Sequence, residues 1–484
     1  MRKIALLLCL SLAAPSYAGF FCRNIFKTWL AHEIALQGPS FTQTELPVAV
    51  IGAGPGGLSA LNSLTKAGIA AVGFERNRRV GGVWDNQRSG SPAYDSLETN
   101  SSISTQHLGD PWPAGTPDFV NRESALQYLI DFSNRHELTP KIQFETEVLS
   151  IEKTSQGTWK VQFSSPKGVG TREFRAVVVA SGVHHKSMAV LPKGLWDEGS
   201  AAGLKVLHSV DYRNNEPFKG LRVLVVGIGN SGAEIATEIS QVAQKTLIAV
   251  RRTPWIVPLR VLGKPADEVG RAGPELPHAF EMFVFGFLQR ITVGSPASLG
   301  FEKPDHDLLG RLPVTDRGFA QSIREGKIQI RSTVSSLENG VAHFTSSAQT
   351  PEPIDAVVFA TGYRQAFPFL PPEYGNVADP GFTLPFLIFH PTEPGLVFLN
   401  ETVVPQSSWS IFIDQSNAMA AYFQAETTNP ERAREFNLRR QNPNPNFKGS
   451  LFSATSDPLH VNPRHYSGPL KNLSEWFREG AGPL

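Results

Sequence analysis

The residues best suited to chemistry in the first part of the chain are glycines at a fixed spacing after a short apolar run. Gly52, Gly54 and Gly57 follow Val48–Ile51, and a run of helical character, 58–66, comes next. In a loop that leads from a strand into a helix, such glycines allow a tight turn, close approach of a pyrophosphate and close helix packing. The helix N-terminus then offers unpaired N–H groups to an anion. This run predicts a dinucleotide site.

An acidic residue indicates which nucleotide the first loop binds. A second apolar run, 70–74, ends in Glu75. A carboxylate accepts hydrogen bonds from a ribose diol and repels a 2′-phosphate. The first site is therefore expected to bind FAD or NAD rather than NADP.

The same pattern recurs later in the chain with the opposite charge at its end. An apolar run, 221–226, precedes a second glycine loop, and 233–240 after that loop is helical in character. The next apolar run, 246–250, ends in Arg251 and Arg252, whose guanidinium groups suit the 2′-phosphate of NADPH. The alternative is a strand end that is merely solvated. The loop residues expected to contact this second nucleotide are Gly227, Gly229, Asn230, Ser231 and Gly232.

Two nearly identical apolar segments predict how the units are connected. Residues 176–182 and 356–362 each read as a buried strand ending at a glycine, one before and one after the second loop. They are natural places for the chain to leave the first unit and to return to it. Alternating runs at 147–152 and 158–163 predict hairpin strands. The expected fold class is α/β, with two Rossmann-like dinucleotide-binding domains, the second inserted into the first.

Composition excludes several other classes of protein. A chain of 484 residues is expected to form two or three packed units, and 41% hydrophobic with 18% charged residues is typical of a globular protein. The formal net charge is +1 without a long basic run, so no nucleic-acid partner is expected. Cys9 and Cys22 do not form a Cys-x-x-Cys pair, which excludes a disulfide reductase.

The N-terminal residues are expected to lie outside both units. Arg2 and Lys3 precede an apolar run, 4–14, which small residues follow. This layout is typical of a secretory signal peptide covering 1–18 and predicts export to a periplasm or lumen. The alternatives are an uncleaved anchor, a wrongly assigned start codon, and a cytoplasmic location if the signal is not used. Residues 19–46 would then form an N-terminal extension.

Several motifs in a fixed order resemble those of the flavin-containing monooxygenases, a branch of the class B flavoprotein monooxygenases. The similarity extends from about Val48 to the region of Gln415. Besides the two glycine loops, the segments that carry it are Glu75-Arg76-Asn77, Gly81-Gly82-Val83-Trp84, Tyr94-Asp95-Ser96-Leu97-Glu98-Thr99-Asn100 and Phe359-Ala360-Thr361-Gly362-Tyr363.

One stretch departs from the family pattern F-x-G-x-x-x-H-x-x-x-F/Y. His208 and Tyr212 are in place, but Ala202 and Leu204 stand at the aromatic and glycine positions. The departure concerns the substrate subclass more than the chemistry, since Baeyer–Villiger monooxygenases carry a related stretch that usually ends in Trp. His208 itself is expected to be a structural histidine at the domain junction.

The resemblance implies a reaction carried by cofactors, with no need for a catalytic triad or a metal. In this family NADPH reduces FAD, O2 adds to the flavin as a C4a-hydroperoxide, and the lone pair of an amine or sulfide takes the distal oxygen. The expected function is thus FAD- and NADPH-dependent oxygenation of a soft nitrogen or sulfur in a small molecule. Two alternatives stay open: Baeyer–Villiger oxygenation of a ketone, and a flavoprotein that mainly yields H2O2.

Asn100 is the expected catalytic residue. Its amide offers donors and an acceptor without a charge, and the resemblance places it near the flavin and the nicotinamide. The alternative is a helix N-cap, since Ser101 and Ser102 follow it. The other residues expected to bind a cofactor, beyond the second loop and its arginines, are Gly52, Gly54, Gly57, Glu75, Arg76, Gly82, Trp84, Thr99, Thr361, Gly362 and Gln415.

These motifs also give expected domain limits. The FAD-binding domain would consist of 47–212 and of 336–484, the latter including a C-terminal segment, and the NADPH-binding domain would be 213–335. Within the second domain the apolar segment Phe280–Ile291 is expected either to pack over the active site or to contact a membrane surface.

Overall fold

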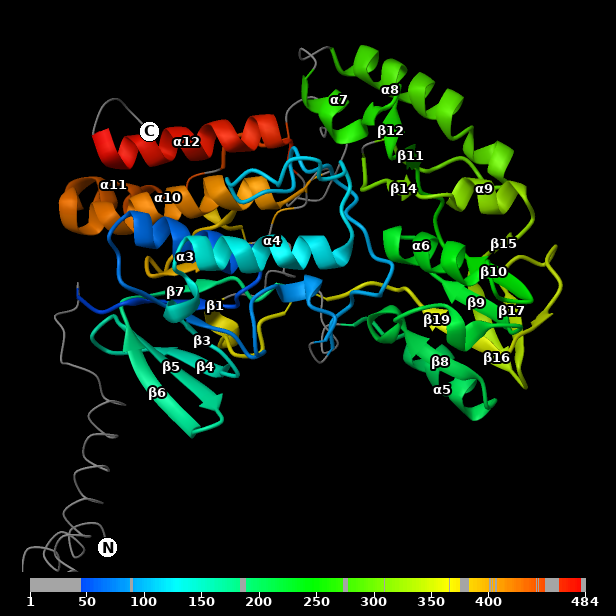
Figure 1. Ribbon diagram of the computed structural model, residues 1–484, viewed down its shortest axis with the longest axis horizontal. Helices are drawn as coiled ribbons and strands as arrows, with labels where there is room; N and C mark the ends of the chain where they lie inside the picture. The colour runs from blue at the N-terminus through cyan, green and yellow to red at the C-terminus, as the bar shows by residue number, and fades with distance from the viewer. Residues whose placement is uncertain are drawn as a thin grey trace, which may run out of the picture.

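The computed structural model describes residues 45–479, except 88–89, 183–188, 273–276, 309, 365, 375–382, 400–401, 403, 405–406, 441, 443 and 449–460. The expected signal peptide and nearly all of the expected extension up to residue 46 lie outside the described residues. Figure 1 shows two bodies of sheets and helices side by side, with the C-terminal helices over the body that contains the first strand.

Five parallel strands form the first sheet, and they come from distant parts of the chain. Their order is β20-β7-β1-β2-β3. Both faces of β1 and β7 are buried, which explains why these strands are continuous apolar runs without alternation. The bounds are β1 (Val48–Ile51), β2 (Ala71–Phe74), β3 (Ile142–Gln143), β7 (Ala176–Val179) and β20 (Leu396–Phe398).

Helices cover one face of the first sheet, and a small antiparallel sheet covers the other. Val48, Val50 and Val178 pack with the helices, whereas Val177 and Val179 pack with the sheet β4-β5-β6. The two predicted hairpin strands are confirmed as β4 and β5. The bounds are α3 (Pro55–Lys66), α4 (Arg122–Arg135), α10 (Trp409–Thr428), α11 (Pro430–Arg439), α12 (Pro463–Glu479), β4 (Glu147–Lys153), β5 (Trp159–Ser165) and β6 (Gly168–Phe174).

The second sheet repeats this architecture with the order β15-β10-β9-β19-β8, again all parallel. Val223 and Val358 pack on one face with helices α6 and α9, and Leu224 and Val357 pack on the other face with α5 and the strands β16–β18. The bounds are β8 (Lys205–His208), β9 (Arg222–Val226), β10 (Lys245–Ala249), β15 (Ile328–Arg331), β19 (Ala356–Phe359), α5 (Lys193–Ala201), α6 (Asn230–Ile239), α9 (Phe319–Arg324), β16 (Val334–Glu338), β17 (Val341–Phe344) and β18 (Glu352–Pro353).

The expected fold class, with one Rossmann-like unit inserted into the other, is confirmed, but the strand assignment at its edges is corrected. The domain limits expected from the sequence assign β8 and β19 to the first domain, yet both lie in the second sheet, where β19 pairs with β9 and β8 pairs with β19. The chain returns to the first sheet only at β20. A buried parallel strand pairs with a partner that is remote in sequence, so its apolar run does not indicate which sheet it joins.

An excursion between β10 and β15 forms the edge of the second unit, at the top right of Figure 1. It contains β11 (Ile256–Pro258), β12 (Arg260–Val261), β13 (Lys264–Pro265), α7 (Ala266–Ala272), α8 (His278–Thr292) and β14 (Val314–Asp316), which pairs with β11.

Helix α8 presents an apolar stripe to solvent. Phe280, Phe283, Phe287 and Ile291 are each more than half exposed, so they do not pack over the active site in this conformation. Contact of this stripe with a membrane surface stays a prediction. No helix in the described part of the chain is long and apolar enough to span a membrane.

Candidate functional site

The first glycine loop, Gly52–Gly57, is shaped by contacts that leave no room for a side chain at its first and last glycines. Gly52 has a φ of +103°, and a Cβ there would lie 2.4 Å from the carbonyl oxygen of Ala180. A Cβ at Gly57 would lie 1.9 Å from the carbonyl oxygen of Gly52. The loop leads from β1 into α3, whose first turn carries no acidic residue and no side-chain cap. The N-terminal N–H groups of α3 are therefore available to an anion.

Glu75 closes the first loop from the end of β2. Its side chain is buried; Oε2 accepts from the backbone N–H of Ala53 at 2.9 Å, and Oε1 accepts from the backbone and side-chain nitrogens of Asn77. A carboxylate has about four acceptor positions, so Oε2 keeps one for a ribose hydroxyl. Arg76, the next predicted residue, points its side chain into solvent beside this site.

A second segment lies over the first loop. The backbone N–H of Gly81 donates to the carbonyl of Ala53 at 3.1 Å, and Gly82 approaches Gly54 so closely that a Cβ on Gly82 would lie 2.9 Å from the Gly54 Cα. Trp84 follows and packs edge-on against Trp409 of α10, with ring centroids 5.9 Å apart. The segment that contains the predicted residues Gly82 and Trp84 therefore covers this loop.

The second glycine loop, Gly227–Gly232, has the same backbone without the cover. Gly227 has a φ of +107°, and a Cβ there would lie 2.5 Å from the carbonyl oxygen of Ala360; a Cβ at Gly232 would lie 2.1 Å from the oxygen of Gly227. Gly229 is exposed and would meet nothing within 4 Å. Ser231 is exposed as well, whereas the side chain of Asn230 accepts from the backbone N–H of Thr315 at 2.8 Å.

Arg251 and Arg252 follow β10 at the carboxyl edge of the second sheet. Both side chains are exposed, and neither forms an ion pair with a residue that the structure describes. In the first unit Glu75 follows β2 directly, whereas after β10 Val250 stands at the equivalent position and the two arginines come next. The end of β2 therefore carries a carboxylate, and the end of β10 is followed by two guanidinium groups. This arrangement agrees with the predicted preference of the second loop for a 2′-phosphate.

Thr361 and Gly362 follow β19 directly after Ala360, which borders the second loop. The hydroxyl of Thr361 donates to the carbonyl of Val190 at 2.5 Å, and Gly362 has a φ of +85°. These two predicted residues thus lie beside the second loop, where β19 ends.

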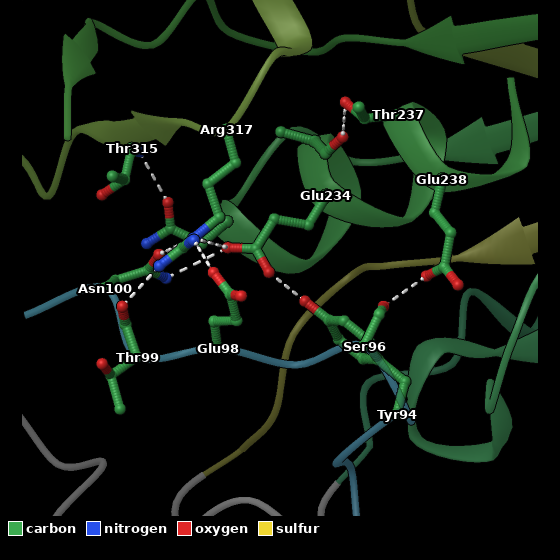
Figure 2. Close-up of polar contacts among 12 residues, drawn as sticks. Tyr94, Ser96, Glu98, Thr99, Asn100, Glu234, Thr237, Glu238, Thr315 and Arg317 are labelled. Carbon is green, nitrogen blue, oxygen red and sulfur yellow. Dashed lines mark hydrogen bonds and ion pairs between the residues drawn. The ribbon is translucent and has the colours of Figure 1, made fainter. Parts of the chain in front are cut away.

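Asn100 contacts the second unit although it belongs to the first. Its Nδ2 donates to Oε1 of Glu234 on α6 at 3.1 Å, and its Oδ1 accepts from Nε of Arg317 at 3.0 Å, as Figure 2 shows. No described helix begins at Ser101 or Ser102, so the alternative reading of Asn100 as a helix cap is wrong. Thr99 is buried and pairs with Val120 through backbone and hydroxyl hydrogen bonds, which anchors the segment in the first unit.

Glu234 is a buried acid at the centre of this junction. Tyr94 donates its hydroxyl to Oε2 of Glu234, and Arg317 lies 4.0 Å from Oε1. Burial raises the pKa of Glu234, although the bonds from Tyr94 and Asn100 and the charge of Arg317 oppose the shift. Burial and the neighbouring carboxylate raise the pKa of Tyr94 well above its ordinary value, so its hydroxyl stays a donor. The sequence singled out Asn100 but gave no signal for its remote partners.

Two further residues singled out by the sequence, Gln415 and His208, are buried. Gln415 on α10 has no exposed surface, and its Nε2 donates to the hydroxyl of Tyr466 on α12 at 2.9 Å. That Gln415 binds a cofactor stays a prediction: its Nε2 lies in the contact between two helices, and its Oε1 has no hydrogen-bond partner among the described residues. His208 is also buried, and its Nδ1 accepts from the backbone N–H of Val210, in agreement with the structural role expected for it.

A family model described as flavin-binding monooxygenase-like matches residues 46–392. The chain belongs to this family. The family is FAD- and NADPH-dependent, and the two loops fit that pair of cofactors. The fit rests on the uncapped helix N-termini after both loops, on the buried Glu75 beside the first loop and on the exposed arginines beside the second.

Among relatives of this flavin-binding monooxygenase-like chain is flavin-containing monooxygenase 5 of Oryctolagus cuniculus. It is 32% identical over 346 residues, which are 67% of this chain and 63% of that protein. Dimethylaniline monooxygenase (N-oxide-forming) 2 of Pan troglodytes is 32% identical over 344 residues, 67% of this chain and 62% of that protein. The chain therefore spans less than two thirds of the length of these relatives.

Solved structures of similar architecture support the fold of this family member. S-allyl-L-cysteine S-oxygenase from Allium sativum has a TM-score of 0.56 at 21% identity and covers 90% of both chains. A cyclohexanone monooxygenase variant from Rhodococcus sp. Phi1 bound to NADP+ has a TM-score of 0.63 at 18% identity and covers 90% of this chain and 98% of the other. At these identities the likeness concerns the arrangement of two Rossmann-like domains.

Proposed function

We propose that this protein is an FAD- and NADPH-dependent monooxygenase that transfers one oxygen atom of O2 to a soft nucleophilic nitrogen or sulfur of a small molecule. The observation that carries the proposal is the pairing of two glycine loops with opposite charges at their strand ends, Glu75 on one and Arg251 and Arg252 on the other. When bound, FAD reduced by NADPH would supply the reaction with O2.

The described residues support three tasks in this reaction. The first glycine loop and Glu75 would hold the pyrophosphate and ribose of FAD. The second glycine loop and Arg251 with Arg252 would hold NADPH by its pyrophosphate and 2′-phosphate. Asn100, at the junction of the two units, would place an uncharged amide next to the reacting groups, where a preorganised donor acts without the cost of moving.

The names of relatives support heteroatom oxygenation as the first choice. One relative is named for N-oxide formation, and one similar structure is an S-oxygenase. The cyclohexanone monooxygenase neighbour supports Baeyer–Villiger oxygenation of a ketone as the second choice. A flavoprotein that mainly yields H2O2 is the third. The three functions differ in the product that carries the oxygen of O2: an N-oxide or sulfoxide, an ester, or H2O2.

A panel of substrates separates these functions. Purified protein with bound FAD would be mixed with NADPH, O2 and a tertiary amine, a thioether or a cyclic ketone, while NADPH, product and H2O2 are quantified together. We expect N-oxide or sulfoxide to account for most of the NADPH consumed. Ester formation from the ketone alone would favour the second choice, and H2O2 equal to NADPH with every compound would contradict oxygenation.

Export through the secretory pathway is also proposed, on the layout of residues 1–18 alone. The mature protein is then expected to begin near Gly19. N-terminal sequencing of the natural protein tests this, and a soluble cytoplasmic form that keeps Met1 would contradict it.

A further inference from the structure

The carboxamide of Asn100 is held at both ends by the second unit. Its oxygen accepts from Arg317, and its nitrogen donates to Glu234. A flipped amide would set its NH2 group against the guanidinium and its oxygen against the carboxylate, which are two repulsive pairs. The two contacts therefore select one orientation of the amide.

Arg317 grips the backbone around Asn100 as well. Its guanidinium also donates to the carbonyl oxygen of Thr99 and pairs with the carboxylate of Glu98 (Figure 2). Only 16% of its side chain is exposed. A planar guanidinium offers its donors in a fixed fork, so three contacts at once define the position of the segment. An ammonium group at this place would keep the charge but would lose the fork.

Glu234 holds the same segment from the other side. Its carboxylate receives the hydroxyl of Tyr94 and the amide of Asn100, and its side chain is 9% exposed. A second acid one turn further along α6, Glu238, accepts from the hydroxyl of Ser96 at 2.8 Å. One face of α6 therefore binds three members of the segment 94–100.

Glu234 and Arg317, the two partners of Asn100, are both connected to one residue of the second glycine loop, Asn230. Glu234 follows Asn230 by one turn on α6. Arg317 lies two residues after Thr315, whose N–H donates to the Asn230 side chain at 2.8 Å. Asn230 itself begins α6 at the loop that would receive the nucleotide. Asn230 is therefore connected to both groups that orient Asn100, to Glu234 along α6 and to Arg317 through Thr315.

We propose that Arg317 and Glu234 are positioning residues that hold Asn100 in one orientation and link it to the state of the second glycine loop. Binding of NADP+ at that loop then orders the segment 94–100. The proposal rests on the proposed function for the catalytic role of Asn100, whereas the link between loop and segment is tested without turnover.

The test without turnover is hydrogen exchange on the purified FAD-containing protein, with and without NADP+. The backbone N–H groups of Leu97 and Thr99 are hydrogen-bonded at 3.2 and 2.9 Å, so their exchange reports the order of the segment. In the wild type NADP+ is expected to slow exchange over 94–100, and in Arg317→Lys this protection is lost. Equal protection in both proteins would overturn the link.

Two controls separate this effect from general damage. Residues 102–106 form an internal reference, because Asp267 holds Ser102 and Thr105 independently of Arg317. Arg311→Ala is the matched variant: Arg311 belongs to the second unit and pairs with the exposed Asp305. Both are expected to behave as in the wild type. If the reference residues lose protection together with 94–100, the effect is structural and the proposal fails.

The test with turnover is the H2O2 released per NADPH consumed. We expect Arg317→Lys and Asn100→Ala each to raise this ratio about fivefold or more. The ratio of the double variant should not exceed that of either single variant, because the effects of contacting residues in one network are not additive. Glu234→Ala, which removes both acceptor oxygens, should act in the same way. Additive effects, or a wild-type ratio in Arg317→Lys, would overturn the positioning role.

The two failures are distinguishable. If the wild type releases only H2O2 with every substrate but NADP+ still protects 94–100 through Arg317, the proposed function fails and the link holds. If the wild type oxygenates its substrate and Arg317→Lys matches it in both exchange and H2O2 ratio, the proposed function holds and the positioning role fails.

Discussion

The two glycine loops have nearly the same backbone in different surroundings. In each loop the first glycine abuts an alanine carbonyl, and the last glycine abuts the carbonyl of the first. The middle glycines differ, since Gly54 lies under Gly82 and Gly229 meets nothing within 4 Å. The same local turn thus forms one covered site and one open site.

The residues expected to contact the ribose or its 2′-phosphate also differ in their exposure to solvent. Glu75 is buried and hydrogen-bonded into its loop, whereas Arg251 and Arg252 are exposed. Under the proposed function, the covered loop suits a resident FAD, and the open loop suits a nucleotide that enters and leaves in every cycle. Because the two loops share their backbone, the difference between a resident and an exchanging nucleotide would come from the surroundings of each loop.

The largest effects are expected from substitutions that disrupt one glycine loop at a time. Gly57→Ala would place a methyl group 1.9 Å from the oxygen of Gly52, and Gly232→Ala one 2.1 Å from the oxygen of Gly227. Overlap of this kind costs several kcal/mol, about 3 or more, at the site concerned. Gly57→Ala should purify colourless, while Gly232→Ala should stay yellow and lose NADPH-dependent reduction. Spectra and rapid mixing with NADPH measure both, and a yellow Gly57→Ala protein with full FAD would refute the first site.

The next largest effect is expected from removal of the positive charge beside the second glycine loop. Replacing both Arg251 and Arg252 by Ala removes two phosphate contacts, each worth about 1.5–3 kcal/mol when fully formed. The KM for NADPH should rise toward that for NADH, while FAD content stays unchanged because Glu75 serves the other loop. Comparison of kcat/KM for the two nucleotides checks this. A double variant that keeps its preference would mean that another basic residue contacts the phosphate.

The smallest effect compares the middle glycines. Both have ordinary negative φ values, so Ala is allowed by the backbone at either position. Gly54→Ala would bring a methyl group 3.4 Å from the Cα of Gly82, at the short end of ordinary van der Waals contact, with a cost of about 1 kcal/mol or less, whereas Gly229→Ala meets open space. Thermal unfolding should show a lower Tm for Gly54→Ala and no change for Gly229→Ala. Equal losses would contradict the distinction between a covered and an open loop.

Local sequence patterns were sufficient to predict the two glycine loops but not the residues that contact Asn100 across the two units. The two strand–loop–helix units were predictable because glycine spacing, apolar runs and the charged strand ends lie within short stretches of sequence. The sheet of β19 and the contacts of Asn100 were not, since both depend on residues brought together by packing over long separations. The contact of Gln415 with Tyr466 on α12 was not predictable for the same reason, because 51 residues separate the two in the chain.

The central claim is that this protein places one atom of O2 on a heteroatom at the expense of NADPH. The direct test is turnover of a tertiary amine or thioether under 18O2 with mass spectrometry of the product. We expect one 18O atom in each N-oxide or sulfoxide and close to one NADPH consumed for each product molecule. Product without 18O, or 18O found only in H2O2, would contradict it.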